Sequence, residues 1–372
     1  MSATRRHPSR AELTRAFEAV PSDVNAETHP DSVVYTFETA PRHLAYMAGL
    51  LADVLEIREH SPEVIQAEKR LIETELATSE QYDSDPLRAL FNEHPFGLPL
   101  GGTPRSVRRL SNEDLIAFDR AGYDPKRITV AVVGRIPPAE LDAVRQRLGS
   151  LAGGGHDDLQ EPLVPQLSLP AFLRRSPKHR HRSVFLGFVL TVPLEPRERL
   201  ILGVLGYRLT SVSTDLFERV RYSDGCTYNY SLGILEMRTT RVFGIHGLTR
   251  ARDRDTFAEH ALRELLGLRC EEKVSEWFDT LRDKYQFFVE HSLDSPESLA
   301  NRIGAEEARD RLEAVLPISD ELAILNELTP ADLCEFANAV LTRECFFVHF
   351  DDRHRLFDTR RFRRRLERCF QR

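Results

Sequence analysis

The sequence has few cysteines, no long apolar run and no excess of positive charge. Its five cysteines are scattered and form no CxxC pair, which argues against a disulfide framework and a cysteine-based zinc site. Eighteen apolar residues never occur in a row, so we expect no membrane-spanning helix. The formal net charge of −7 gives no general reason to expect nucleic acid as a partner. No apolar segment follows the first arginines, so we expect a cytoplasmic protein in a reducing compartment.

The length of 372 residues suggests two domains, and the hydrophobic fraction of 41% is enough for ordinary cores. Residues 151–182 are rich in glycine, proline and basic residues, which is typical of a linker. We therefore expect one domain over 1–150, the linker over 151–182, a second domain over 183–350 and a basic tail over 351–372.

Helices and paired strands recur in both halves. In the first half we expect a helix capped by Ser9, two strands within 23–38 and a helix after Pro41. We then expect a helix that begins at Pro62, a helix capped by Ser111 and a short buried strand over 127–136. In the second half we expect a strand at 184–190, a helix at 200–209, a strand pair ending in 238–248, helices through much of 256–341 and a strand at 345–350.

Two internal echoes indicate a duplication. The segment Phe17-Glu-Ala-Val followed by Ser22-Asp23 matches Phe217-Glu-Arg-Val followed by Ser223-Asp224. LSNEDLIAF at 110–118 matches LTPADLCEF at 328–336, and the elements follow the same order in both halves. The pattern predicts an α+β fold with two related domains, each an antiparallel sheet with helices packed on one face.

The stretch IQAEKRLIETEL, residues 65–76, holds three glutamates. On a helical wheel at about 100° per residue, Glu68 and Glu75 fall inside the apolar arc, whereas Glu73 lies outside it. A carboxylate facing a core costs several kcal/mol unless it is paired, protonated or metal-bound. We therefore expect Glu73 at the surface and a partner for Glu68 and Glu75.

The chain resembles the M16 peptidases, the insulinase and mitochondrial-processing-peptidase family. The segments that carry the resemblance are DVNAETHPDSVVYTFE, the Glu68-to-Glu75 helix, HPFGLPLGGTPRSVRRLSNEDLIAF, RITVAVVGRI and LFERVRYSDGCTY. The resemblance implies two α+β domains of the M16/LuxS-like metallohydrolase type. It also implies that two such chains or halves close around a peptide, so we expect a homodimer or a heterodimer with another M16 chain. It implies zinc hydrolysis, with Glu75 as the third zinc ligand and Glu68 as the glutamate that supports the site.

The family's HxxEH motif is absent from the sequence. By the family's spacing, counting back from Glu75 places the second histidine at Met1 or just before it, so we expect the first domain to be truncated and zinc to bind only if upstream residues supply the histidines. Three interpretations compete: a clipped metallopeptidase, a non-catalytic subunit that completes another chain's site, or a degenerate scaffold. As written, the polypeptide lacks a full zinc site.

Arg221 and Tyr228 match the family's Arg–Tyr pair, which reaches the carbonyl group of the substrate. The resemblance implies that they stabilise the oxyanion of the tetrahedral intermediate. The alternative is that Arg221 lies at a helix end and Tyr228 in a strand, both packing normally and with no role in the chemistry. The family's glycine-rich turn before this helix is replaced by TSVSTDLF. Asn25 and Ala26 match the edge strand that, in the family, pairs with the backbone of the substrate. The alternative is that they lie in an ordinary half-buried strand.

The tail is strongly basic, and Phe362, Leu366 and Phe370 share one helical face. Docking on an acidic partner, nucleic acid or a membrane surface is one interpretation. A helix packed on the second domain with a solvated arginine face is the favoured one.

The resulting hypothesis for the whole chain is an M16-type zinc metalloendopeptidase acting on peptides in a closed chamber. The alternative is a non-catalytic M16 subunit that binds peptide and completes a partner's active site.

Overall fold

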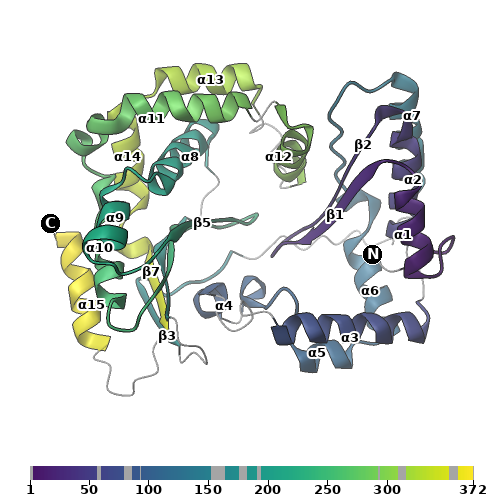
Figure 1. The fold of residues 1–372 in the computed structure, drawn as a ribbon, viewed down its shortest axis with the longest axis horizontal. Coiled ribbons are helices and arrows are strands. Elements are labelled where there is room, and N and C mark those ends of the chain that lie inside the picture. Colours follow the sequence, from purple (N-terminus) through teal and green to yellow (C-terminus); the bar gives the residue numbers. More distant parts are fainter. Residues whose placement is uncertain are drawn as a thin grey trace. The chain divides into compact units, whose positions relative to one another are not determined.

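The structure is a computed structural model that describes residues 3–56, 60–78, 86–92, 94–151, 164–175, 182–190, 194–291, 294–308, 316–351 and 359–371. The chain divides into two compact units. Unit 1 comprises Met1–Ser79, Pro99–Glu161 and Ser292–Val315, and unit 2 comprises Glu80–Leu98, Pro162–His291 and Leu316–Arg372. Both contain helices and strands, which confirms the predicted α+β class (Figure 1).

Unit 1 is built around a two-stranded antiparallel hairpin, in which Ala26 lies opposite Tyr35. Small apolar clusters involving Met47, Leu50 and Val144 pack its helices together. The helices and strands of unit 1 are α1 (Arg10–Glu18), β1 (Ser22–Thr28), β2 (Val33–Thr39), α2 (Leu44–Leu55), α3 (Pro62–Thr78), α5 (Pro104–Arg109), α6 (Asn112–Gly122), α7 (Pro138–Gly149) and α12 (Pro296–Ala308).

The predicted caps of unit 1 are present. The Ser9 hydroxyl accepts a hydrogen bond from the Glu12 backbone N–H at 3.3 Å, and the Ser111 hydroxyl accepts one from the Asp114 N–H at 3.2 Å. Both sites are complete capping boxes, because the side chain of the third helical residue returns the bond. The short polar signals that were read from the sequence therefore mark these helix starts correctly.

The predicted buried strand over 127–136 is wrong. These residues adopt no strand, and Val130 is 48% exposed. A strand is stabilised by hydrogen bonds to a neighbour, and the described sheet of this unit contains only β1 and β2. The segment is rich in β-branched residues, but among the described residues no neighbouring strand pairs with it.

Unit 2 contains a five-stranded sheet in the order β3-β7-β4-β6-β5. The β3–β7 pair is parallel and the other pairs are antiparallel, with Gly187 opposite Gly244 across β4 and β6. The elements of unit 2 are α4 (Pro86–Phe91), β3 (Ala171–Arg175), β4 (Arg182–Leu190), α8 (Pro196–Thr210), α9 (Asp215–Glu218), β5 (Tyr230–Glu236), β6 (Arg241–Thr249), α10 (Arg254–Gly267), α11 (Glu271–His291), α13 (Ile318–Glu327), α14 (Pro330–Val340), β7 (Phe346–Asp351) and α15 (Thr359–Glu367).

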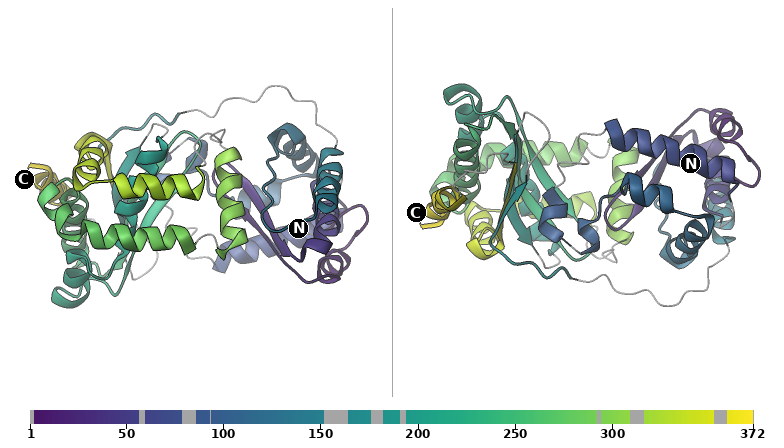
Figure 2. Two further views of the ribbon diagram at one scale, coloured as in Figure 1. Left: turned by 90° about the horizontal axis from the view of Figure 1, so that it is seen from above. Right: turned by 90° about the horizontal axis from the view of Figure 1, so that it is seen from below.

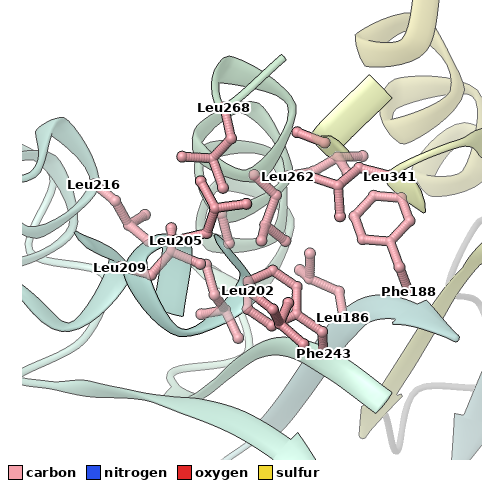
Figure 3. Packing of buried hydrophobic residues seen from close by; sticks show 14 of the residues in the cluster. Leu186, Phe188, Leu202, Leu205, Leu209, Leu216, Phe243, Leu262, Leu268 and Leu341 are labelled. Atoms are coloured by element: carbon pink, nitrogen blue, oxygen red, sulfur yellow. The ribbon is translucent and has the colours of Figure 1, made fainter. Parts of the chain in front are cut away.

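The main core of unit 2 lies between the sheet and its helices. Leu186 and Phe243 point from the sheet toward α8 and α10, and Phe188 points toward Leu341 at the end of α14 (Figure 3). Helix α11 runs alongside α13 and completes this helical layer (Figures 1 and 2). On the opposite face of β4, Phe185 packs in a second apolar cluster with Phe91 of α4. Burial on both faces explains why β4 reads as a continuous apolar run instead of an alternating one.

The basic tail packs on unit 2, as the favoured interpretation expected. Phe362 and Leu366 are fully buried, and the Phe362 ring lies 4.9 Å from the Phe350 ring, centroid to centroid. Arg365 forms an ion pair with Glu259 of α10, while Arg361 and Arg364 are exposed. The amphipathic pattern therefore serves intramolecular packing.

Two further features of unit 2 bear on the sequence predictions. The stretch 151–182, which was expected to be a linker, contains β3 and the first residue of β4. Within the described residues, the helical stretch Pro196–Ser223 is long and apolar enough to cross a membrane by length and composition. More than half of its most apolar window is buried inside the protein, which is typical of a core helix.

Candidate functional site

Arg221 and Tyr228 lie together at the surface of unit 2. Arg221 belongs to a π-helical turn, Arg219–Ser223, that continues α9, and Tyr228 precedes β5. The Arg221 Nη1 donates a hydrogen bond to the Tyr228 carbonyl oxygen at 3.3 Å. The guanidinium carbon lies 4.2 Å from the centroid of the Tyr228 ring, within the range of a cation–π interaction. The seven-residue spacing thus becomes a direct contact.

Two further rings surround the same guanidinium. Its central carbon lies 5.3 Å from the Phe217 ring centroid and 5.7 Å from the Tyr222 ring centroid. Among the described residues, the recorded contacts of the Arg221 head group are with these rings and a carbonyl, not with a carboxylate. Its remaining N–H donors are therefore available to an acceptor on a ligand. We call Phe217, Arg221, Tyr222 and Tyr228 the aromatic–arginine cluster.

The loop after the π-helical turn is held at several points. The Asp224 N–H donates to the Arg219 carbonyl at 2.8 Å, and Gly225 follows with a φ of 56°. An Arg250 Nη2 donates to the Gly225 carbonyl oxygen at 2.8 Å. The Asp224 carboxylate lies 2.6 Å from the Nε2 of His260 on α10. These contacts fix the backbone between Arg221 and Tyr228.

The start of α9 is equally well anchored. The Thr214 hydroxyl caps the helix by accepting from the Phe217 N–H at 3.0 Å, and it also bonds the Tyr230 hydroxyl at 3.0 Å. The Leu216 N–H donates to a Glu264 carboxylate oxygen at 3.2 Å. Burial raises the pKa of Glu264 above its ordinary value, and the neighbouring Arg208 partly opposes that rise. The segment that carries Arg221 is thus tied to α10.

Glu68 and Glu75 are not buried as the helical wheel predicted. Both lie on α3 of unit 1, where Glu75 is exposed and the Glu68 side chain is 31% exposed, 3.6 Å from Arg10. Leu71 from the same apolar arc is also 39% exposed. The arc is only half covered because α3 packs against the short helix α5 instead of a sheet. The assignment of Glu75 to zinc and of Glu68 to its support stays a prediction.

Glu73 forms an ion pair with Arg108 of α5 at 3.0 Å. The Lys69 ammonium group donates to the carbonyl oxygens of Arg108 and Leu110, at 3.1 and 2.6 Å. The polar face of α3 therefore docks on the following segment. Glu73, whose side chain is 31% exposed, is partly covered by this contact although the wheel placed it at the surface.

The described residues do not make a zinc site by themselves. No group of three or more histidine, cysteine, aspartate or glutamate side chains among them has an arrangement that could hold a metal ion. A catalytic zinc site needs three protein ligands, and Glu75 offers one carboxylate. Glu75 is exposed, and a zinc site that includes it would need two further ligands from outside the described residues.

Asn25 and Ala26 lie on β1, an exposed strand whose sole sheet neighbour in the described structure is β2. The Ala26 N–H donates to the Asn25 side-chain oxygen at 2.9 Å, and the Asn25 amide donates to Glu27 at 3.0 Å. A peptide that pairs with β1 through the Ala26 N–H must therefore displace the Asn25 side chain. Pairing with substrate stays a prediction.

Sequence reasoning missed Phe217, Tyr222 and His260, although one signal was present. In the first internal copy, one residue, Pro21, separates the Phe-Glu-x-Val segment from Ser-Asp. In the second copy, two residues, Arg221 and Tyr222, fill that interval. A π-helical turn accommodates one extra residue, and such turns are frequent at functional sites.

Family models match most of the chain. The model described as insulinase (peptidase family M16) matches residues 1–103, and the model described as the peptidase M16 inactive domain matches residues 109–280. The chain belongs to the M16 peptidase family. The first of these matches contains Glu68 and Glu75, and the second contains the aromatic–arginine cluster.

Curated relatives of this M16 chain carry names of zinc proteases. The uncharacterized zinc protease YmxG of Bacillus subtilis is 24% identical over 337 residues, covering 87% of this chain and 79% of the relative. An uncharacterized zinc protease of Mycobacterium leprae is 28% identical over 231 residues, which are 59% of this chain and 51% of the relative. The match to the mycobacterial protein thus spans about half of its length.

Solved structures support the fold. A protease from Helicobacter pylori superposes with a TM-score of 0.79 at 14% identity, covering 94% of this chain and 86% of that one. The peptidase M16 inactive domain from Pseudomonas fluorescens gives a TM-score of 0.70 at 17% identity, covering 92% and 83%. At these identities the likeness establishes the M16 fold alone.

Proposed function

We propose that this chain is the structural core of an M16-type zinc metalloendopeptidase that acts on peptides. The observation that carries the proposal is the direct contact between Arg221 and Tyr228 at an exposed, well-anchored turn. Membership of the M16 family and the zinc-protease names of its relatives support the reaction class. Within the part of the chain that the structure describes, Arg221 contacts three aromatic rings and the Tyr228 carbonyl oxygen, so its other N–H donors suit a peptide carbonyl oxygen.

Within this proposal the side chains of the chain have separate tasks. Arg221 and the Tyr228 hydroxyl donate hydrogen bonds to the carbonyl oxygen under attack, where negative charge develops. β1 holds the peptide main chain along its open edge at Asn25 and Ala26. Glu75 is a ligand of zinc and Glu68 supports the site, provided that two histidines from outside this sequence complete it.

The proposal also includes the setting of the reaction. The peptide is enclosed when this chain pairs with a second M16 chain, either a copy of itself or a different member of the family. The complex acts in the cytoplasm, for which the scattered cysteines and the bacterial relatives give support. Neither nucleic acid nor a membrane is a partner in this proposal.

A comparison of Glu75→Gln with Glu73→Gln tests the function. We expect the wild-type protein, isolated from its own cells through a C-terminal tag, to hold one zinc per active site and to cleave unstructured peptides. Glu75→Gln should lower zinc affinity and cleavage at least tenfold, since it removes a charged ligand. Glu73→Gln should change both by less than twofold, because Glu73 lies on the same helix as Glu75 but pairs with Arg108 of α5. Elemental analysis and mass spectrometry of the peptide products measure the two effects.

Arg221→Ala separates substrate binding from the metal. It should retain wild-type zinc content and lower cleavage about tenfold or more, because it removes donors from the reacting carbonyl. Full cleavage by the Glu75→Gln variant would contradict the proposal. Peptide binding by a wild-type sample that holds no zinc and cleaves nothing would instead support a binding-only subunit.

A further inference from the structure

Tyr222 is a large aromatic residue that lies mostly exposed beside Arg221. Its side chain is 65% exposed, and Tyr228 on the other side of Arg221 is 78% exposed. An exposed ring leaves apolar surface in contact with water, and tyrosine is enriched where proteins contact ligands because its ring is large and rigid. Two such rings beside one cation therefore indicate a contact surface.

The orientation of Tyr222 is set by its neighbours. The Phe217 ring, which is half-buried, meets the Tyr222 ring edge-on with centroids 6.1 Å apart, and it also contacts Tyr230 at 6.4 Å. Val220, next to Arg221 in the turn, is 1% exposed and pins the backbone to the core. The half-buried Phe217 ring thus supports the exposed Tyr222 ring beside Arg221.

The backbone at this place is specialised. Compared with the first internal copy, the second has one extra residue, and the π-helical turn at Arg219–Ser223 absorbs it. An α-helical turn is more stable than a π-helical one, so the extra residue needs a compensating role. The two residues that replace Pro21 are Arg221 and Tyr222, which are both members of the aromatic–arginine cluster.

We propose that Tyr222 is a specificity-determining residue that contacts an aromatic side chain of the bound peptide, beside the peptide group held by Arg221. This inference rests on the proposed function, because it needs a peptide at Arg221. The Tyr222 and Phe217 rings offer flat apolar surface, and Arg221 adds a cation that also favours a π face. An alanine or serine at the same peptide position gains neither contact.

The test uses the 372-residue chain and a set of fluorescent ten-residue peptides. Each peptide has one phenylalanine at a different position in an alanine–serine background, and one peptide has none. Fluorescence anisotropy gives Kd for each. At one or two positions, phenylalanine should tighten binding to the wild-type chain about three- to tenfold. Tyr222→Ala should remove this gain, so that peptides with and without phenylalanine bind with equal Kd.

Two variants serve as controls. Tyr222→Phe should keep the gain, because the ring is retained. Phe287→Ala, which removes a 67%-exposed ring on α11 of the same unit, should change nothing.

The outcomes separate the two proposals. Arg221→Ala should weaken binding of every peptide, with or without phenylalanine. If Tyr222→Ala keeps the phenylalanine gain while Arg221→Ala weakens all peptides, the role of Tyr222 is overturned and the proposed function stands. If the wild-type chain binds no peptide, or if Arg221→Ala binds all of them as the wild type does, both are overturned.

Discussion

At the residue scale, the chemistry of this protein depends on side chains whose surroundings come from several elements. Arg221 contacts Phe217 of α9 and Tyr228, which precedes β5. His246 of β6 lies 2.8 Å from the Ser183 hydroxyl of β4. In both places a polar group sits against aromatic or apolar neighbours, and its behaviour follows from that environment.

His246 should make the stability of unit 2 pH-dependent. Burial lowers its pKa below the ordinary value of 6.5, so the unfolded chain binds a proton at a pH where the folded chain does not. Stability is therefore full above about pH 6.5 and falls as the pH drops toward the folded pKa, by at most about 1.4 kcal/mol per pKa unit of lowering. Calorimetry between pH 7.5 and 5.5 should show a smaller loss of Tm for His246→Gln than for the wild type.

His29→Gln is the matched control for this measurement. The His29 side chain is 44% exposed and lies in the loop between β1 and β2. Its replacement should leave the pH dependence of Tm as in the wild type. An identical pH dependence in the wild type and His246→Gln would contradict the explanation by burial.

At the element scale, β4 and β6 are joined through a close glycine pair. Gly187 and Gly244 lie opposite each other, and a Cβ at either position would overlap backbone atoms of the partner strand. β4 is buried on both faces and its neighbours carry large rings. The strand pairing of unit 2 thus depends on the absence of side chains at one register position.

Gly187→Ala should destabilise unit 2 by about 1–3 kcal/mol, because the added methyl forces the strands apart. The control is Gly267→Ala in the last turn of α10, where the nearest atom to a new Cβ is a flexible Lys273 carbon at 3.9 Å. That change should be neutral or slightly stabilising, since alanine favours a helix. Urea unfolding followed by circular dichroism compares the two. Equal stability of both variants would show that the sheet yields without cost.

At the scale of the whole molecule, the two units differ in the size of their cores. Unit 2 has a large continuous cluster between the sheet and the helices (Figure 3), and Phe362 and Leu366 of the C-terminal helix α15 belong to it. Unit 1 is held by small clusters around α1, α2 and α7, and its hairpin has two strands. A two-stranded hairpin is marginal alone, so we expect unit 1 to unfold first.

Phe362→Ala should lower the upper of two calorimetric transitions and leave the lower one unchanged. Phe362 is fully buried against Phe350, and its truncation costs about 3–5 kcal/mol. Leu13, in α1, is 1% exposed, so Leu13→Ala should lower the lower transition and leave the upper one unchanged. A single transition that responds to both variants would mean that the two units unfold together.

Local sequence signals predicted much of this architecture. The caps at Ser9 and Ser111, the hairpins of β1–β2 and β5–β6 and the amphipathic tail all follow from patterns within a few residues. These features depend on short-range hydrogen bonds and side-chain periodicity, which the sequence contains directly. The resemblance to the M16 family was confirmed by family models over both halves.

The candidate site was predicted in part. The sequence named Arg221 and Tyr228, and the fold brings them into contact. It placed Glu68 and Glu75 against a core, but α3 leaves Glu75 exposed, since a helical wheel cannot tell which neighbour covers an arc. The strand expected over 127–136 failed for the same reason, because a strand exists only beside a partner.

The sequence by itself determined the family, the duplicated α+β pattern, the helix starts and the residue types available for chemistry. These depend on the order of side chains along the chain and on interactions between near neighbours. The tertiary structure alone decided that Phe217 and Tyr222 surround Arg221, that His260 contacts Asp224, and that Glu75 of α3 is exposed. Each of these facts depends on which elements meet in space, and long-range packing sets that outcome.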